Sequence, residues 1–408
     1  MQALARARPV FELGLDLCAF LFLPILVLAS RGAAPLAVVA GVCALGLVAD
    51  NLAVAWRRVR RLAPLFAALV VWGLLSSLWA IEPQRSVLMS FRLTALFAAG
   101  LALIAAAGEI RAPQRLLYCF LTGFALSLVL AVVQYATGGA LTAPLARRAF
   151  IEPALNNIED GLGLLLPPLC ATLILRDRGV AAAVLALPTI VVIFLLVGDA
   201  ARIAFIAGVI AAAALYLRRH WLTRLAAIAS VVFILAAPAI LPPLAGIAAM
   251  RHDAQEVKFS AWHRLEIWSF VGGKIAEKPV FGWGLDSSRA IPGGSAPIPG
   301  TPNGQQWLPL HPHNAALQIW LELGAPGAIL FAWLVAWVWL RLGDASWPPL
   351  YAAAAGSSLV TALIIAFGSY GVWQEWWIGT EFLTVFVILV MARITAQPMP
   401  DTRSGSIS

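Results

Sequence analysis

Long apolar runs follow one another along almost the whole of this chain. Apolar residues make up 61% of its 408 positions and charged residues only 12%, whereas an ordinary soluble domain is about one quarter charged. Many runs reach the roughly 17–25 residues that a helix needs to cross a hydrocarbon core. A chain in lipid must satisfy its backbone polar groups internally, and these runs lack the period-two alternation of barrel strands. The sequence therefore predicts an all-α, polytopic membrane protein.

The pattern predicts about twelve spans, with approximate limits 11–30, 33–54, 63–80, 87–107, 115–136, 161–175, 180–197, 203–217, 224–245, 325–341, 348–369 and 378–395. Residues 1–245 hold the first nine spans. Residues 246–324 form a long outer loop with short helices and a histidine-bearing helix, 325–395 hold the last three spans, and 396–408 form a tail. The first run is too long for a typical signal core, so we expect it to be retained as a span.

Arginines are distributed unequally between the two sets of short loops. The set that includes both termini holds sixteen: Arg6, Arg8, Arg57, Arg58, Arg60, Arg61, Arg111, Arg115, Arg176, Arg178, Arg218, Arg219, Arg224, Arg341, Arg393 and Arg403. Outside the 246–324 loop, the other set holds five: Arg31, Arg85, Arg147, Arg148 and Arg202. Short loops rich in basic residues face the cytoplasm, so both termini are predicted to be cytoplasmic and the long loop to face outward. The same bias explains the net charge of +8 without a nucleic-acid partner.

Four of the five histidines lie in or at the edge of the polar stretch 247–312, namely His252, His263, His311 and His313. Proline favours the first position of a helix, so Pro312 is predicted to begin one, with His311 near its cap and His313 in its first turn. The positive end of the helix dipole disfavours imidazolium there. A neutral His313 is thus a candidate general base.

Two other interpretations of these histidines remain open. His313 is, more simply, a solvated loop residue. A metal site at His311 and His313 is disfavoured, because side chains two positions apart diverge on a helix and no cysteine or close carboxylate cluster completes a ligand set. No metal and no cofactor is therefore predicted.

Arginines at the outer ends of spans are the second group of candidates. Arg202 lies in a very short predicted turn, and Arg264 lies on a predicted amphipathic helix. Two guanidinium groups at this depth suit the pyrophosphate of a lipid through bidentate hydrogen bonds. The alternative is that they contact ordinary phospholipid headgroups, or pair with Asp199 and Glu266.

Further polar residues on the same side form a lower tier of candidates. Arg92 lies inside a predicted span, which marks it as functional or as structurally paired with a carboxylate. Arg147 and Arg148 add positive charge before the sixth span, and Glu375 sits among tryptophans where it can orient a hydroxyl or an arginine.

The cytoplasmic loops contain no phosphate-binding loop motif. An enzyme of this design needs a substrate that is already activated, and a lipid pyrophosphate meets that need.

Three motifs in and after the polar stretch resemble a known family. They are Arg264-Leu-Glu-Ile-Trp268, then Pro279-Val-Phe-Gly282-Trp-Gly284, then His313-Asn314 followed by Glu322-Leu-Gly324 and Gly327. In this order and spacing they are similar to the O-antigen ligase/polymerase family, most of all to lipopolysaccharide O-antigen ligases. The span count and the place of the long outer loop agree with that resemblance.

The resemblance implies a membrane-embedded (GT-C-like), metal-independent, inverting glycosyltransferase of the bacterial inner membrane with a periplasmic active site. Its donor would be a glycan on undecaprenyl pyrophosphate and its acceptor the lipid A-core. The family's essential histidine maps onto His313, and its arginines map onto Arg264 and Arg202. Many relatives have Ser-Arg-Gly where this chain has Ala-Arg202-Ile, which leaves Arg202 less secure.

The remaining candidates extend the predicted site. His311, Asn314, Arg147, Arg148, Arg92 and Glu375 complete the expected substrate-binding set. Asn314 and Glu322 are interpreted as supporting residues rather than catalysts. An O-antigen polymerase or a protein O-oligosaccharyltransferase would use the same donor. A solute transporter is the alternative of another class, disfavoured because the polar residues gather outside rather than at the membrane midplane.

Overall fold

The computed structural model describes residues 2–143, 155–247, 250–253, 258–299, 301 and 304–396. The helices over these ranges are α1 (Gln2–Leu28), α2 (Ala33–Val48), α3 (Leu52–Val59), α4 (Ala63–Leu75), α5 (Pro83–Ala106), α6 (Pro113–Ala136), α7 (Asn156–Leu175), α8 (Gly179–Leu195), α9 (Asp199–Ala245), α11 (Phe259–Glu277), α12 (Ala315–Asp344), α13 (Pro349–Gly368) and α14 (Glu375–Thr395). Over the same ranges no strand forms, apart from one isolated bridge between Pro297 and Gln306. The all-helical prediction is confirmed.

Nine helices of the described chain are long and apolar enough to cross a membrane, and two shorter apolar helices, Ala63–Leu78 and Gly179–Leu195, accompany them. α9 has 47 residues, about 70 Å at 1.5 Å per residue, which is more than twice a hydrocarbon core. It covers the two predicted spans 203–217 and 224–245, and its backbone breaks at Arg218 (φ −144°, ψ 46°). Each predicted span therefore corresponds to apolar helix, and the chain is a polytopic membrane protein.

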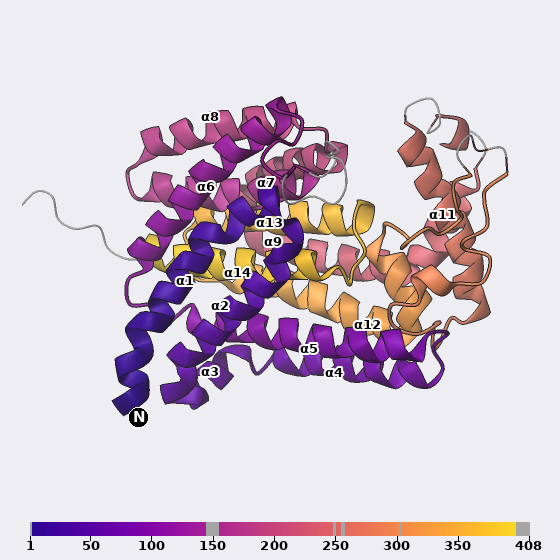
Figure 1. Ribbon diagram of the computed structural model, residues 1–408, viewed down its shortest axis with the longest axis horizontal. Coiled ribbons are helices and arrows are strands. Elements are labelled where there is room, and N and C mark those ends of the chain that lie inside the picture. The colour runs from indigo at the N-terminus through magenta and orange to yellow at the C-terminus, as the bar shows by residue number, and fades with distance from the viewer. Residues whose placement is uncertain are drawn as a thin grey trace, which may run out of the picture.

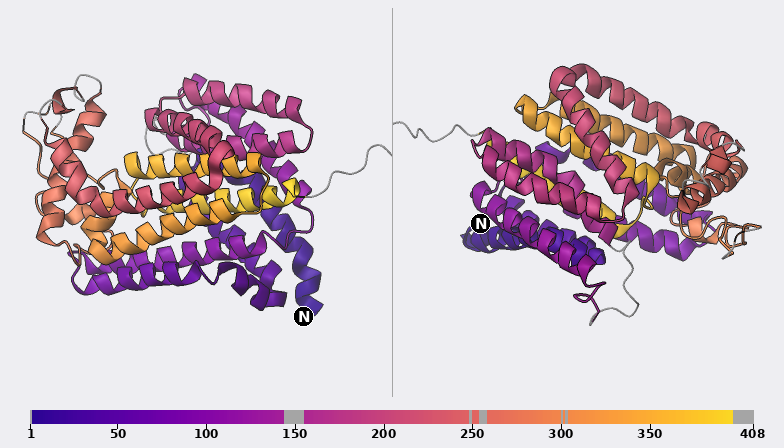
Figure 2. Two further views of the ribbon diagram at one scale, coloured as in Figure 1. Left: turned by 180° about the vertical axis from the view of Figure 1, so that it is seen from behind. Right: turned by 90° about the horizontal axis from the view of Figure 1, so that it is seen from above.

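The helices form a bundle from which α11 projects at one end (Figures 1 and 2). The start of α1 lies at the opposite end, where Arg8 donates to the carbonyl of Glu109 and Arg58 pairs with the Glu109 carboxylate. The end of α14 lies there too, because Arg393 donates to the carbonyls of Ala107 and Ile110. Arginines that the sequence assigns to the cytoplasm thus gather at the end away from α11. α7 and α14 are buried along most of their length.

α12 is two helices joined at a sharp break. Gly324 has φ 63° and ψ −158°, a conformation that is essentially restricted to glycine. The first piece bridges the bundle, since Asn314 at its start donates to the Phe367 carbonyl of α13 and Trp72 of α4 donates to the Leu323 carbonyl at its end. The second piece is the predicted span that begins at 325.

The Pro279–Gly284 turn packs directly against this break. A break exposes carbonyls that would otherwise accept bonds within the helix, and here Trp283 N–H donates to Leu321 O and Gly284 N–H to Glu322 O, both at 2.9 Å. Ala325 N–H in turn donates to Pro279 O at 3.0 Å. The Pro279–Gly284 motif and the Glu322–Gly324 motif are therefore joined to each other by backbone hydrogen bonds.

Replacing Gly324 by alanine is expected to destabilise the protein strongly. A Cβ at this position would lie 2.1 Å from the Val280 carbonyl oxygen, which is backbone and has little freedom to move. Strain and clash together should cost about 2–4 kcal/mol, measured as a lower midpoint of thermal unfolding in detergent. Gly273→Ala is the matched control, because its Cβ would meet nothing within 4 Å and alanine favours a helix. Equal midpoints for the two variants would show that the contact is not important for stability.

Candidate active site

The His311–Asn314 segment enters α12 three residues later than predicted. The helix begins at Ala315, and Asn314 is its N-cap, with its side-chain oxygen accepting from Leu317 N–H at 3.0 Å. The predicted start at Pro312 is wrong, because asparagine caps helices well and this cap is buried and held on its amide side by Phe367. His313 therefore lies before the helix, not in its first turn. Its φ is 54°, a left-handed conformation that is uncommon outside glycine.

His313 is held in one tautomer. Its Nδ1 lies 2.6 Å from the carbonyl oxygen of Ser369. A carbonyl only accepts, so Nδ1 carries the proton and Nε2 keeps its lone pair. The pKa of His313 is lowered to about 4, chiefly by burial and to a smaller extent by the charge of Arg264, while the Ser369 bond opposes the shift. At neutral pH the ring is uncharged, but burial rather than the helix dipole is the main cause.

His311 is buried beside His313, and its predicted contact with substrate stays a prediction. It is 6% exposed, and its ring centroid lies 4.3 Å from that of His313. The Gln374 amide, whose oxygen accepts from Trp376, lies with its nitrogen 3.1 Å from His311 Nε2. Burial, with a smaller effect from His313, lowers the pKa of His311 to about 3. Nδ1 of His311 accepts from the backbone N–H of His313 at 3.2 Å, and its Nε2 faces the Gln374 amide, so both ring nitrogens of His311 have neighbours. The open imidazole nitrogen of the pair is therefore Nε2 of His313.

Arg264 lies close to both histidines. α11 is attached to their segment by Trp268, whose indole N–H donates to the Pro312 carbonyl at 2.9 Å. Within the part of the chain that the structure describes, the buried Nε of Arg264 has no hydrogen-bond partner. Burial lowers the pKa of Arg264, while the Asp199 carboxylate acts in the opposite direction. A half-buried guanidinium with an unused donor is suited to bind an anion.

Arg202 already has carboxylate neighbours. It lies in the first turns of α9, 3.6 Å from Asp199 and 3.9 Å from the fully buried Glu159. Lys258, just before α11, also pairs with Asp199. The pairing of Arg202 with Asp199, which the sequence left open, is therefore present. Asp199 connects the α9 arginine electrostatically with Arg264 on α11.

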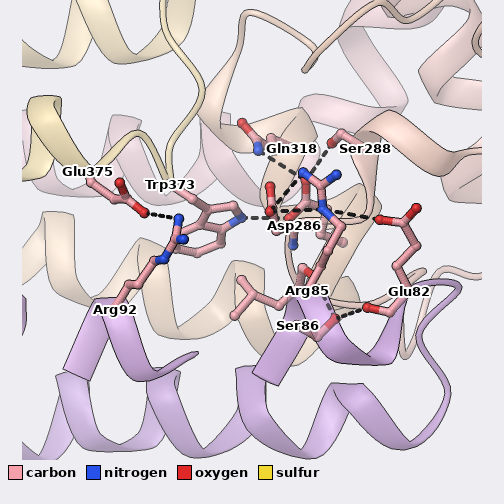
Figure 3. A network of polar contacts seen from close by, with 11 residues as sticks. Glu82, Arg85, Ser86, Arg92, Asp286, Ser288, Gln318, Trp373 and Glu375 are labelled. Atoms are coloured by element: carbon pink, nitrogen blue, oxygen red, sulfur yellow. Dashed lines mark hydrogen bonds and ion pairs between the residues drawn. The ribbon is translucent and has the colours of Figure 1, made fainter. Parts of the chain in front are cut away.

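Arg92 and Glu375 form a direct ion pair at 2.7 Å between α5 and α14 (Figure 3). Both side chains remain partly exposed. Nearby, Arg85 pairs with Asp286 at 3.2 Å, as the same figure shows. Arg92 thus has the carboxylate partner that was one of the two alternatives from the sequence. The predicted contact of Arg92 with substrate stays a prediction. Arg147 and Arg148 lie outside the described residues.

Comparisons with known proteins place several of these residues in a region that matches a known family. The model of the O-antigen ligase family matches residues 181–332, which run from α8 into α12 and include Arg202, Arg264 and His313. That region resembles the O-antigen ligase family.

Proteins of Rickettsia resemble about a third of this chain. One from Rickettsia conorii, named "Putative polysaccharide ligase", is 41% identical over 141 residues, which are 34% of this chain and 33% of the relative. A protein of the same name from Rickettsia felis is 40% identical over 141 residues, with the same shares. One from Rickettsia bellii is 38% identical over 141 residues. The chain therefore spans about a third of the length of the curated relatives that it matches.

Glu322, in the motif that ends the O-antigen ligase region, is a centre of hydrogen bonds. Its fully buried carboxylate accepts from Ser288 and Gln318 at one oxygen, and from Asp286 N–H and the Trp373 indole at the other. Figure 3 shows Asp286, Ser288, Gln318 and Trp373 turned toward one another. The carboxylate thus joins three segments around the histidines, and its interpretation as a supporting residue agrees with these contacts.

Sequence reasoning missed the segment Ser369–Gln374 between α13 and α14. It supplies the carbonyl on His313, the Gln374 contact with His311, and the Trp373 bond to Glu322. Its only signal in the sequence was the run of aromatic residues that flanks Glu375. Over the described ranges, no group of three or more His, Cys, Asp or Glu side chains is arranged to hold a metal ion.

Proposed function

We propose that this protein is an O-antigen ligase, which transfers a glycan from undecaprenyl pyrophosphate to the lipid A-core at the periplasmic face of a bacterial inner membrane. The observation that carries the proposal is a neutral His313, open at Nε2, under the electrostatic influence of Arg264, whose buried Nε has no hydrogen-bond partner among the described residues. A base and an anion binder are the two groups that such a transfer needs. The match of residues 181–332 to the family supports the choice of substrates.

In the proposed reaction, His313 Nε2 removes the proton from a hydroxyl group of the acceptor sugar. The hydroxyl oxygen forms a bond to the anomeric carbon of the donor glycan from the side opposite the diphosphate. The bond between that carbon and the diphosphate oxygen breaks, and the electron pair leaves with the lipid diphosphate. The anomeric configuration is thereby inverted.

Arg264 stabilises the charge that grows on the departing diphosphate. Its burial strengthens this interaction because the surrounding dielectric is low. Arg202 is the second binder in this proposal, with its carboxylate neighbours Asp199 and Glu159 fixing its position. Both arginines belong to helices that meet at the end of the bundle away from the N-terminus.

The sidedness supports a periplasmic site. Arg8 and Arg58, which the sequence assigns to the cytoplasm, meet at Glu109 at one end of the bundle. The histidines, Arg264 and Arg202 are at the other end. A site placed there would meet a lipid-linked donor after it has crossed the membrane.

Transfer is expected to continue in excess EDTA. The proposed stabilisation of the leaving group comes from guanidinium groups, so removing divalent cations should leave the rate within about twofold of the untreated value. The measurement is product formation by purified protein with and without chelator. Activity that is lost with EDTA and restored by a divalent cation would instead support a metal site at His311 and His313.

The acceptor is tested by competition in a single purified system. Lipid-linked glycan is supplied as the donor, and rough lipopolysaccharide, a second lipid-linked glycan and a serine-rich peptide are offered together. A ligase glycosylates the lipopolysaccharide. Product on the second glycan would identify a polymerase, and product on the peptide a protein O-oligosaccharyltransferase.

A further inference from the structure

The open nitrogen of His313 depends on the position of a single carbonyl. Ser369 O accepts from His313 Nδ1–H at 2.6 Å, and this bond selects the tautomer with a bare Nε2. Ser369 follows the last residue of α13, where the backbone leaves the helix (φ −132°, ψ −69°). A carbonyl at such a point needs an anchor to stay in place.

Tyr370, the next residue, provides a contact across the bundle. Its hydroxyl lies 2.6 Å from Asp160 Oδ2 and 3.1 Å from Asn157 Oδ1, both on the first turns of α7. Asp160 is 2% exposed, so this contact is shielded from water. Burial, reinforced by the Asp160 carboxylate, raises the pKa of Tyr370 well above its usual range, and the hydroxyl stays protonated as a donor.

The ring of Tyr370 is fixed as well. It packs edge-on against Trp376 with ring centroids 4.7 Å apart, and lies 5.6 Å from Trp377. Such aromatic pairs add stabilisation beyond the area they bury. With the hydroxyl bound to α7 and the ring held by α14, the backbone at 369–370 has little freedom.

The other half of the segment is attached to α12. Val372 N–H donates to Gln318 Oε1 at 2.9 Å, and the Trp373 indole donates to Glu322. These bonds fix residues 372–373 relative to the helix that His313 precedes. Tyr370 is therefore the point that fixes the same segment relative to α7.

We infer that Tyr370 and Asp160 are positioning residues, which hold the Ser369 carbonyl on Nδ1 of His313 and so keep Nε2 free to accept a proton. The inference rests on the proposed function of His313 as the base. Neither residue touches the imidazole, and neither lies in the 181–332 region of the family match. At metal-bound histidines, outer contacts that set the tautomer typically contribute 10- to 100-fold in affinity or activity, and we take the same range as a guide here.

The test is Tyr370→Phe, which removes the hydroxyl and keeps the ring. We expect kcat to fall roughly 10- to 100-fold, while KM for the lipid-linked donor stays within about twofold, because the arginines are untouched. Asp160→Asn keeps an oxygen acceptor for the hydroxyl and should retain most of the rate, whereas Asp160→Ala should resemble Tyr370→Phe.

Tyr351→Phe is the matched control. It also removes a fully buried tyrosine hydroxyl, but one that donates to the Ile388 carbonyl of α14, and Tyr351 lies near the start of α13 whereas Ser369 follows its end. We expect its kcat to equal that of the wild type at temperatures where both are folded. An equal fall in kcat for Tyr351→Phe and Tyr370→Phe would overturn the inference, since any lost tyrosine bond would then have the same effect.

A spectroscopic measurement separates this inference from the proposed function. In protein labelled with ¹⁵N-histidine, the His313 signals are identified by their loss in His313→Gln. The wild type should show a protonated Nδ1 and a bare Nε2, and Tyr370→Phe a mixture of both tautomers. An unchanged tautomer in Tyr370→Phe would refute the positioning role even if the rate falls. A wild type without transfer activity would refute the proposed function, and the tautomer comparison would still decide the role of Tyr370.

Discussion

Replacing His313 by asparagine is expected to abolish glycan transfer while leaving the fold intact. The amide cannot take a proton at neutral pH, so we expect a loss of about 10²–10⁴-fold, the usual contribution of a general base. Asparagine is preferred to alanine because it tolerates the left-handed backbone (φ 54°) that His313 adopts. The measurement is the rate of transfer by purified protein, with the thermal midpoint recorded alongside.

His220→Asn is the control for this prediction. His220 is exposed on α9, next to the break at Arg218, and is remote from the candidate site. Its variant should transfer at the wild-type rate. Smooth lipopolysaccharide at normal levels in cells that carry only the His313 variant would contradict the assignment of the base. His313→Ala provides the comparison in which a lost base and backbone strain act together.

The same assignment gives the direction of the pH dependence. The pKa of His313 is lowered from the ordinary histidine value of 6.5 to about 4. The catalytic, neutral form therefore persists as the pH falls through 6.5, and the rate should decline only as the pH approaches the lowered value. Folding stability behaves differently and falls as the pH drops from 6.5 toward 4, because the unfolded chain binds protons in that range and the folded site does not. A rate that halves near pH 6.5 would contradict a buried base.

Replacing Arg264 by lysine is expected to impair transfer about 10²-fold. The ammonium group keeps the charge but lacks the planar fork that binds a diphosphate through two parallel hydrogen bonds. The loss should appear in kcat as well as in donor KM, since the charge on the diphosphate grows as the bond to the glycan breaks. The measurement is steady-state transfer over a range of donor concentrations.

Arg251→Lys is the matched control for Arg264. Arg251 belongs to the same outer part of the chain, but it is paired with Glu266 at 3.2 Å and donates to the Ala245 carbonyl. A lysine there can keep the ion pair, so we expect a rate within about twofold of the wild type. Wild-type transfer by Arg264→Lys would limit Arg264 to contact with lipid headgroups.

The fold was predictable because crossing a membrane imposes a length and a polarity that are visible locally. Each predicted span corresponds to apolar helix, and the predicted start of a span at 325 coincides with the break at Gly324. The exact ends of helices depend on single side chains. The sequence predicts a helix start at Pro312, whereas Asn314 is the N-cap of a helix that begins at Ala315. Neighbouring residues can each begin or cap a helix, and the hydrophobic pattern alone does not show which of them does.

The site was predictable only in part, because its residues meet over long distances in the chain. His313 and Arg264 were candidates from their local motifs. The pairing of Arg92 with Glu375 joins residues 283 positions apart, and that of Tyr370 with Asp160 joins residues 210 apart. Neither pair has a local pattern, since each depends on how α5, α7 and α14 pack. Burial has the same origin, and it rather than the helix dipole accounts for most of the lowered pKa of His313.

The segment Ser369–Gln374 lies beyond the residues that the family match covers, yet it contacts both histidines. Residues 181–332 are therefore not sufficient to form the candidate site. If these residues were transferred to another membrane protein, they would include His313 and Arg264. They would lack the Ser369 carbonyl that fixes the proton of His313 and the Asp160 carboxylate that binds Tyr370. To exchange acceptor preference between relatives, it is better to swap outer loops and keep the helical bundle intact than to transfer residues 181–332 as a whole.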